Sequence, residues 1–146
     1  MIALLQRVAA ANVVVSDQRI AEIGPGLLVL VAVEPGDGER TIERMAERLL
    51  TYRVFSDSDG KMNRSLLDDG LELLLVPQFT LAADTKKGTR PSFARAAPPD
   101  VGKRYFQALL ERCRQRLPAT KCGEFAAHMQ VSLTNDGPVT FWLQVA

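Results

Sequence analysis

The hydrophobic pattern in the first part of the chain predicts β-strands. Residues 2–8 and 13–15 are rich in valine, leucine and alanine and lack the spacing of an amphipathic helix. Two further apolar runs, 20–23 and 27–33, flank Gly24-Pro25-Gly26. Proline followed by glycine at the central turn positions is typical of a type II turn, so we predict a hairpin here. Its second run is almost wholly apolar, which is typical of a strand buried on both faces.

Two later segments show apolar residues at helical spacing on a charged background, and they predict two main helices. The first follows Asp37, a residue that can cap a helix. Its apolar stripe consists of Ile42, Met45, Ala46, Leu49 and Leu50. The second helix is predicted to begin at Asp100 and to stop at Pro118. Its stripe consists of Phe106, Leu109, Leu110, Cys113 and Leu117.

The rest of the chain predicts more strands. We expect strands at 54–55, 71–81, 125–134 and 139–145, a polar turn at 56–60 and a loop over 82–99. Strands interleaved with only two helices favour an α/β fold with mixed sheets, and the length of 146 residues suits a single domain.

Composition narrows the function classes. Hydrophobic residues make up 47% and charged residues 24% of the chain, as in ordinary globular proteins. The longest apolar run near the start, residues 2–5, is too short for a signal sequence or a membrane helix, so we expect a cytoplasmic protein. In the cytoplasm, Cys113 and Cys122 are expected to be free thiols. The one histidine, His128, excludes a two-histidine zinc site and is more often structural than catalytic. A net charge of +1 gives no overall positive field for binding nucleic acid, so any contact with RNA must come from local basic patches.

Residues 76–81 are the first segment with possible chemistry. They are either a core strand that ends at a loop or a strand end that binds a ligand. Pro77 removes a ladder donor, which indicates an edge or a bulge, and Gln78 is an amide that needs partners within an apolar run. Irregular backbone at such a strand end can direct N–H groups at an oxyanion.

Residues 135–140 are the second such segment. Asn135, Asp136, Gly137 and Pro138 are turn-forming residues, which favours a hairpin turn. The alternative is a cis Gly137–Pro138 bond, whose two carbonyl groups would accept hydrogen bonds from an amine together.

A cluster of cations forms the third segment. Lys86, Lys87 and Arg90 lie within the predicted loop, which is either a solvated surface or a contact for RNA phosphates. Four further cations either extend such a patch or form the exposed side of the second helix. They are Arg112, Arg114, Arg116 and Lys121.

Seven segments, taken together and in order, resemble the D-aminoacyl-tRNA deacylase family over essentially the full chain. They are IALLQR (2–7), IGPGLL (23–28), YRVF (52–55), GKMNRSL (60–66), QFTLAAD (78–84), KGTRPSF (87–93) and NDGPVT (135–140). The resemblance implies hydrolysis of the ester of D-aminoacyl-tRNA, and of glycine mischarged on tRNA for alanine. With it, the expected fold has mixed, largely antiparallel sheets in a layered, barrel-like arrangement with two main helices.

The resemblance also implies a homodimer with two active sites at the subunit interface and no metal or cofactor. Gln78, Phe79 and Thr80 are then the catalytic segment, with a backbone N–H stabilising the oxyanion. The substrate-binding residues are Gly137, Pro138, Arg7, Met62 and Asn63, with the Gly-Pro pair cis, supplied by the partner subunit and braced by Arg7. The tRNA-binding residues are Lys86, Lys87 and Arg90.

One position departs from the family pattern, because Pro77 replaces the usual serine. A related animal paralogue, which removes L-alanine from a mischarged tRNA, has proline and glutamine at the first two positions of this segment. Phe79, Asp136 and residues 139–141 follow the D-specific pattern, which favours D-specificity. Two alternatives remain: a deacylase with relaxed chirality and a non-catalytic nucleic-acid-binding module.

Overall fold

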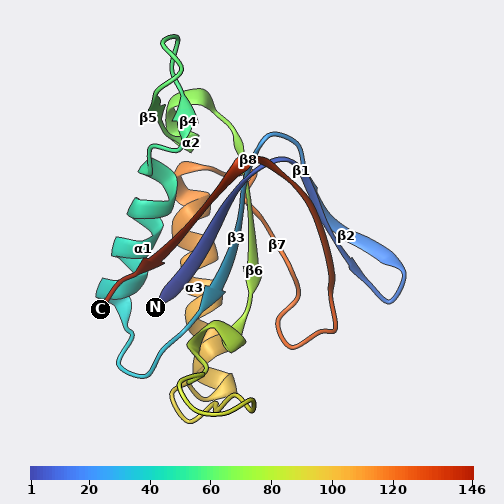
Figure 1. Ribbon diagram of the computed structural model, residues 1–146, viewed down its shortest axis with the longest axis vertical. Helices are drawn as coiled ribbons and strands as arrows, with labels where there is room; N and C mark the ends of the chain where they lie inside the picture. Colours follow the sequence, from blue (N-terminus) through green and yellow to red (C-terminus); the bar gives the residue numbers. More distant parts are fainter.

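One mixed sheet organises the computed structural model, which describes residues 1–146 (Figure 1). Its central strand β1 (Ile2–Val15) pairs antiparallel with β2 (Gln18–Ile23), β3 (Gly26–Ala32) and β8 (Gln130–Gln144). Strand β6 (Glu72–Pro77) runs parallel to β3, and the short β7 (Lys121–Cys122) runs parallel to β6. The sheet curls until β2 approaches β6 and β7, so that it is nearly closed into a barrel. The predicted α/β class with mixed sheets is confirmed.

Two helices cover one face of this sheet. Figure 1 shows α1 (Glu39–Thr51) and α3 (Pro99–Arg116) lying together against it, and both predicted apolar stripes face the core. The short α2 (Leu66–Asp69) is capped by Ser65. Burial among these elements raises the pKa of the Cys113 thiol to about 12, so this cysteine is an unreactive core residue. No helix is both long and apolar enough to cross a membrane.

The apolar strands β3 and β6 are buried on both faces, as predicted for β3. Alternate residues face two separate cores because successive side chains of a strand point to opposite sides. Leu27 and Leu73 pack with the helices, whereas Leu28 and Leu74 fill the inside of the curled sheet. These two strands therefore form the rigid centre that positions the loops at their ends.

The predicted hairpin around Gly24-Pro25-Gly26 is wrong. Strands β2 and β3 both pair with β1, in succession along its length, and not with each other. Gly26 does not have the positive φ that a type II turn requires. A Cβ atom on Gly26 would lie 1.9 Å from the carbonyl oxygen of Glu72, so glycine is needed here for the close approach of β6. The actual hairpin turn is at Ser16 and Asp17, which both have positive φ.

Other element boundaries also differ from the predictions. The two predicted N-terminal strands are one strand, β1, and the predicted strand 71–81 ends at Pro77. Gly38, not Asp37, is the N-cap of α1, because the Asp37 carboxylate accepts hydrogen bonds from the Met1 ammonium and from the Glu34 N–H. The polar turn 56–60 belongs to a small hairpin of β4 (Phe55–Ser56) and β5 (Met62–Arg64).

Candidate active site

The segment of residues 77–80 begins where β6 ends. Pro77 is the last residue paired with β3, and a residue without an N–H cannot continue the ladder. The N–H of Gln78 still donates to the Val31 carbonyl at 2.7 Å, after which the chain turns into a short 3-10 helix, η1 (Phe79–Ala82). The Gln78 side-chain amide donates to the Thr80 hydroxyl. The N–H groups of Phe79 and Thr80 lie in the first turn of this helix, where N–H groups have no intrahelical acceptor.

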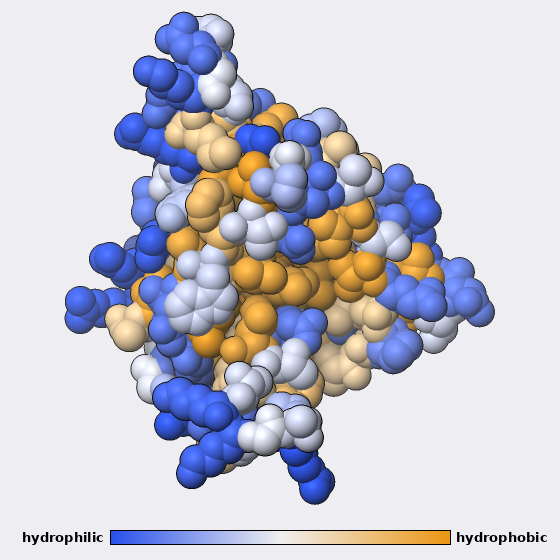
Figure 2. Space-filling model, in the orientation of Figure 1, coloured by the Kyte–Doolittle hydropathy of each residue, from blue (hydrophilic) through white to orange (hydrophobic).

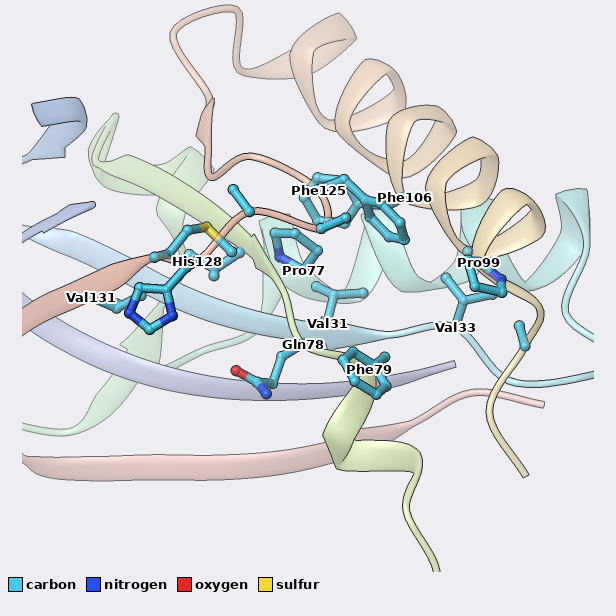
Figure 3. A pocket seen from close by; sticks show the side chains of 16 residues that line it. Val31, Val33, Pro77, Gln78, Phe79, Pro99, Phe106, Phe125, His128 and Val131 are labelled. Atoms are coloured by element: carbon cyan, nitrogen blue, oxygen red, sulfur yellow. The ribbon is translucent and has the colours of Figure 1, made fainter. Parts of the chain in front are cut away.

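A cavity of about 410 Å³ lies beside this segment, in the size range of small-molecule sites. It is lined by residues of β3, the end of β6, the start of α3 and residues 125–131. Figure 3 shows Gln78 and His128 toward one end of the cavity and Phe106, Phe125 and Pro99 toward the other. The cavity therefore has a polar end at the 77–80 segment and an apolar, aromatic end.

His128 is not the structural histidine that its surroundings in the sequence favoured. It is exposed, it lines the cavity, and its ring makes no hydrogen bond to another residue. The chain reaches this position through a turn in which Ala126 has a positive φ of 65°. The predicted strand over 125–134 begins only at Gln130 for this reason.

Residues 135–140 do not form a hairpin turn. Strand β8 runs through them, and residues 136–139 bulge out between the pairs Gln6–Thr140 and Val8–Asn135. We call residues 136–139 the Gly-Pro bulge. The Gly137–Pro138 peptide bond is cis, as the resemblance implies, and both residues are exposed.

Two side chains hold the Gly-Pro bulge in place. The Asn135 amide spans it: its oxygen accepts from the Val139 N–H at 2.7 Å, and its nitrogen donates to the Val139 carbonyl at 3.2 Å. From the neighbouring strand, Arg7 donates from Nε to the Asp136 carbonyl and from a terminal nitrogen to the Val54 carbonyl, both at 2.8 Å. The Arg7 side chain is only 14% exposed. The bulge is thus a braced feature and not a loose loop.

Met62 and Asn63 lie on the β4–β5 hairpin, which follows Val54 and projects from one end of the molecule (Figure 1). The Met62 side chain is 44% exposed. The Asn63 amide donates to the Asp57 carboxylate at 2.9 Å, and this hydrogen bond holds the pKa of Asp57 below its ordinary value. Asn63 therefore shapes the hairpin, and its role toward substrate stays a prediction.

The predicted RNA-contacting cations lie on a loop that is closed at its base. Asp84 and Ser92 exchange two backbone hydrogen bonds, of 2.8 and 3.0 Å. Lys86, Lys87 and Arg90 are exposed on this loop and form no ion pair within 4.0 Å.

The cations of the second helix do not extend this patch. Arg112 pairs with Glu39 at 2.9 Å, and Arg116 pairs with Glu47, so both are neutralised on α1. Arg114 donates to the Thr120 carbonyl at 2.9 Å. Lys121 donates to the Glu22 carbonyl at the far edge of the sheet. Arg112, Arg114 and Arg116 lie on α3, as the helix-face alternative expects, whereas Lys121 lies on β7.

Within one chain, the 77–80 segment and the Gly-Pro bulge do not meet. Asn135 pairs with Val8 of β1, and Val8 pairs with Gly26 of β3. Gly26 in turn pairs with Glu72, so the bulge lies level with the start of β6. Pro77 lies five residues further, at the end of β6, and this length of strand spans about 17 Å. The predicted site residues thus form two groups at opposite ends of the sheet.

Comparison with known proteins decides the family. The family model described as D-Tyr-tRNA(Tyr) deacylase matches residues 4–144. The chain belongs to the D-aminoacyl-tRNA deacylase family. It is 61% identical to the D-aminoacyl-tRNA deacylase of Nitrosococcus oceani over 99% of this chain and 94% of that protein. It is 59% identical to the D-aminoacyl-tRNA deacylase of Stenotrophomonas maltophilia over 99% of each. As a member of this family, the chain is an ester hydrolase that acts on D-aminoacyl-tRNA.

Solved structures share the fold of this chain. The structure described as c-Myc DNA Unwinding Element Binding Protein superposes with a TM-score of 0.95 at 38% identity and covers 100% of this chain and 99% of its own. A structure described as a probable eukaryotic D-amino acid tRNA deacylase superposes with a TM-score of 0.88 over 99% of this chain and 98% of its own. At 16% identity, the second shows the deacylase fold alone.

Sequence reasoning did not assign several residues of the candidate site. His128, Phe106 and Phe125 line the cavity, and Asn135 closes the bulge. The two phenylalanines read as ordinary core residues, and no local pattern separates a cavity wall from a core. The only signal for Asn135 was its place before the Gly-Pro pair, where its short amide can mimic backbone.

Proposed function

We propose that the deacylase works as a homodimer in which each active site combines two chains. One copy supplies the 77–80 segment with its cavity, and the other supplies the Gly-Pro bulge. The observation that supports this most is the separation of about 17 Å between these two exposed segments along the sheet of one chain. A single aminoacyl ester is too small to contact both segments of one chain.

Strand β8 supports the proposed dimer. It pairs only with β1, so its other edge is open over much of its length. It carries two exposed aromatic side chains, Phe141 and Trp142, on opposite faces of the strand, and the Trp142 side chain is 54% exposed. Figure 2 shows apolar residues gathered across the middle of the face that β8 and β1 cross. Sedimentation should give about twice 16.0 kDa, and a fully active monomer would rule out the shared site.

The cavity suits the terminal nucleoside of tRNA. Its aromatic end, formed by Phe106 and Phe125, matches a base, and its polar end at Gln78 matches the ribose and the ester. An N–H of Phe79 or Thr80 would then stabilise the oxyanion that forms when the acyl carbon is attacked. Gln78 shapes this end of the cavity and is held by the Thr80 hydroxyl.

The Gly-Pro bulge of the partner subunit would select the amino acid. The carbonyl oxygens of Gly137 and Pro138 accept hydrogen bonds from the substrate ammonium group, and we infer from the family resemblance that the exposed Met62 also contacts the substrate. The side chain of an L-amino acid then meets backbone and is excluded, whereas a D side chain points to solvent. Glycine has no side chain, so glycine on tRNA for alanine is also a substrate.

The reaction needs positioning more than a strong protein nucleophile. The ester is reactive, and the neighbouring 2′-hydroxyl of the terminal ribose orients the attacking water. The water oxygen bonds to the acyl carbon, and the ribose 3′ oxygen leaves with a proton. Neither a metal nor a cofactor is needed. The compartment we propose is the cytoplasm, where aminoacyl-tRNA is made and used.

Incubation with paired D- and L-tyrosyl-tRNA, followed by ester loss, tests this function. We expect release of D-tyrosine, release of glycine from glycyl-tRNA, and no release of L-tyrosine. Equal release of D- and L-tyrosine would indicate relaxed chirality. Pro77→Ser, which introduces the usual family residue, would then be the variant to measure. Binding without release of any amino acid would favour a nucleic-acid-binding module, as the name of one structural relative, c-Myc DNA Unwinding Element Binding Protein, describes for that protein.

A further inference from the structure

Two large aromatic side chains are exposed next to the 77–80 segment. The Phe79 side chain is 58% exposed and the Phe93 side chain is 44% exposed. Their ring centroids lie 5.3 Å apart with an interplanar angle of 53°. Phe79 lines the cavity, whereas Phe93 lies outside it. These two rings, which we call the Phe79–Phe93 pair, therefore form an apolar surface at the mouth of the cavity.

The Phe79–Phe93 pair is joined to the cationic loop. Phe93 directly follows Ser92, whose backbone pairs with Asp84 and closes the loop. The loop carries Lys86 and Lys87 and one further free cation, Arg90. Aromatic rings on which bases stack, next to cations that contact phosphate, are the combination by which proteins bind single-stranded nucleic acid.

We propose that the Phe79–Phe93 pair is a stacking platform for the unpaired nucleotide that precedes the terminal nucleoside of tRNA. The proposal rests on the proposed function, in which the terminal nucleoside occupies the cavity. With the ester at the Phe79 N–H, the 3′ strand leaves the cavity past the rings of Phe79 and Phe93. Its next base then meets these rings, and its phosphates face Lys86, Lys87 and Arg90. The occupant of this surface is single-stranded RNA and not a second protein chain.

Phe93 variants test the platform without changing the Phe79 backbone. Phe93→Leu removes the ring but keeps an apolar side chain, and Phe93→Trp keeps an aromatic surface. Ile20→Ala is the matched control, because Ile20 is also 44% exposed but lies on β2. For each protein, the dissociation constant is measured for uncharged tRNA and for the same tRNA lacking its last two nucleotides.

Phe93→Leu should weaken binding of intact tRNA by roughly 5- to 100-fold and leave binding of the shortened tRNA unchanged. Phe93→Trp and Ile20→Ala should bind both as the unmodified protein does. With D-tyrosyl-tRNA, Phe93→Leu should raise KM and preserve kcat. Equal affinities of all four proteins for intact tRNA would overturn the platform, and so would an equal loss on both tRNAs. A changed sedimentation coefficient in Phe93→Leu would instead show that a second copy covers the rings.

The binding comparison does not depend on the reaction. If the unmodified protein failed to hydrolyse D-tyrosyl-tRNA, the proposed function would fail, whereas the loss of affinity in Phe93→Leu would still be measured. If hydrolysis of D-tyrosyl-tRNA succeeded and the Phe93 variants bound normally, only the platform would fail.

Discussion

Replacing Arg7 by methionine should release the Gly-Pro bulge from the body of the protein. Arg7 joins the bulge to the chain segment that precedes the β4–β5 hairpin. It donates one hydrogen bond to the Asp136 carbonyl in the bulge and another to the Val54 carbonyl before the hairpin. Methionine keeps the apolar stem of arginine and removes all its donors. Both carbonyl groups then lose a charged donor at 2.8 Å.

The expected loss of stability follows from these two contacts. A hydrogen bond from a charged donor contributes about 1.5–3 kcal/mol. Water can replace Arg7 at the exposed Asp136 carbonyl but less well at the partly buried Val54 carbonyl, so we expect a loss of about 3 kcal/mol in total. For a chain of this size, such a loss lowers Tm by roughly 10 °C.

The loss of activity should exceed what stability explains. A displacement of about 1 Å in a positioning group can cost about 100-fold in rate, so kcat/KM for D-tyrosyl-tRNA should fall by about that factor at 25 °C. Arg7→Lys is the control, because a single ammonium group cannot reach both carbonyls and should give an intermediate result. If Arg7→Met lost stability but kept normal kcat/KM, Arg7 would support the fold only, and the bracing argument would be refuted.

Other predictions concern the reaction, the RNA contact and acid stability. Thr80→Val should keep activity within about tenfold, whereas loss of a true nucleophile would cost about 10⁶-fold. A D-tyrosyl-tRNA substrate whose terminal ribose lacks the 2′-hydroxyl should be cleaved poorly by the unmodified protein. Lys86→Ala with Lys87→Ala should weaken binding of all tRNAs alike and reduce the log–log salt slope by about 1.5, which filter binding at several salt concentrations measures. Burial raises the pKa of Glu34, but its hydrogen bond and ion pair with the buried Met1 ammonium outweigh this effect and hold that pKa below its ordinary value of 4.5. The Glu34–Met1 ion pair therefore stabilises the fold above pH 4.5, and this stabilisation is lost as the pH falls below the lowered pKa of Glu34. Tm should thus decline in acid more steeply for the unmodified protein than for Glu34→Gln.

The helices and the buried strands could be predicted from the sequence because their signals are local. The stripe from Ile42 to Leu50 has helical spacing, and all five of its residues are buried in α1. The apolar run of β3 is buried on both faces for the same reason. Pro77 indicated an edge or a bulge within a strand expected over 71–81, whereas the strand ends at Pro77 and a 3-10 helix follows.

Features set by distant partners could not be predicted in this way. The same Gly24-Pro25-Gly26 sequence fits a hairpin and a strand-to-strand crossing, and the close approach of Glu72 to Gly26 decides between them. Asn135 begins a run of turn-forming residues, yet pairing with β1 on both sides makes that run a bulge. The site segments were found through the resemblance, whereas the cavity wall at His128 depends on tertiary structure alone.

A hybrid dimer tests the shared active site most directly. Gly137→Ala would place a Cβ atom 2.6 Å from the Val139 backbone nitrogen, so the Gly-Pro bulge must change shape. Phe79→Pro removes the proposed oxyanion donor at the first position of η1, where proline is tolerated. Each homodimer should be inactive on D-tyrosyl-tRNA, because both of its sites carry one defect.

The two variants are co-expressed with different affinity tags, and the dimer that carries both tags is purified. If the sites are shared, one site of this hybrid contains both defects and the other contains none, so it should show about half the activity of the unmodified dimer. If each site were built within one chain, both sites of the hybrid would be defective. A hybrid as inactive as its two parent homodimers would therefore contradict the shared site.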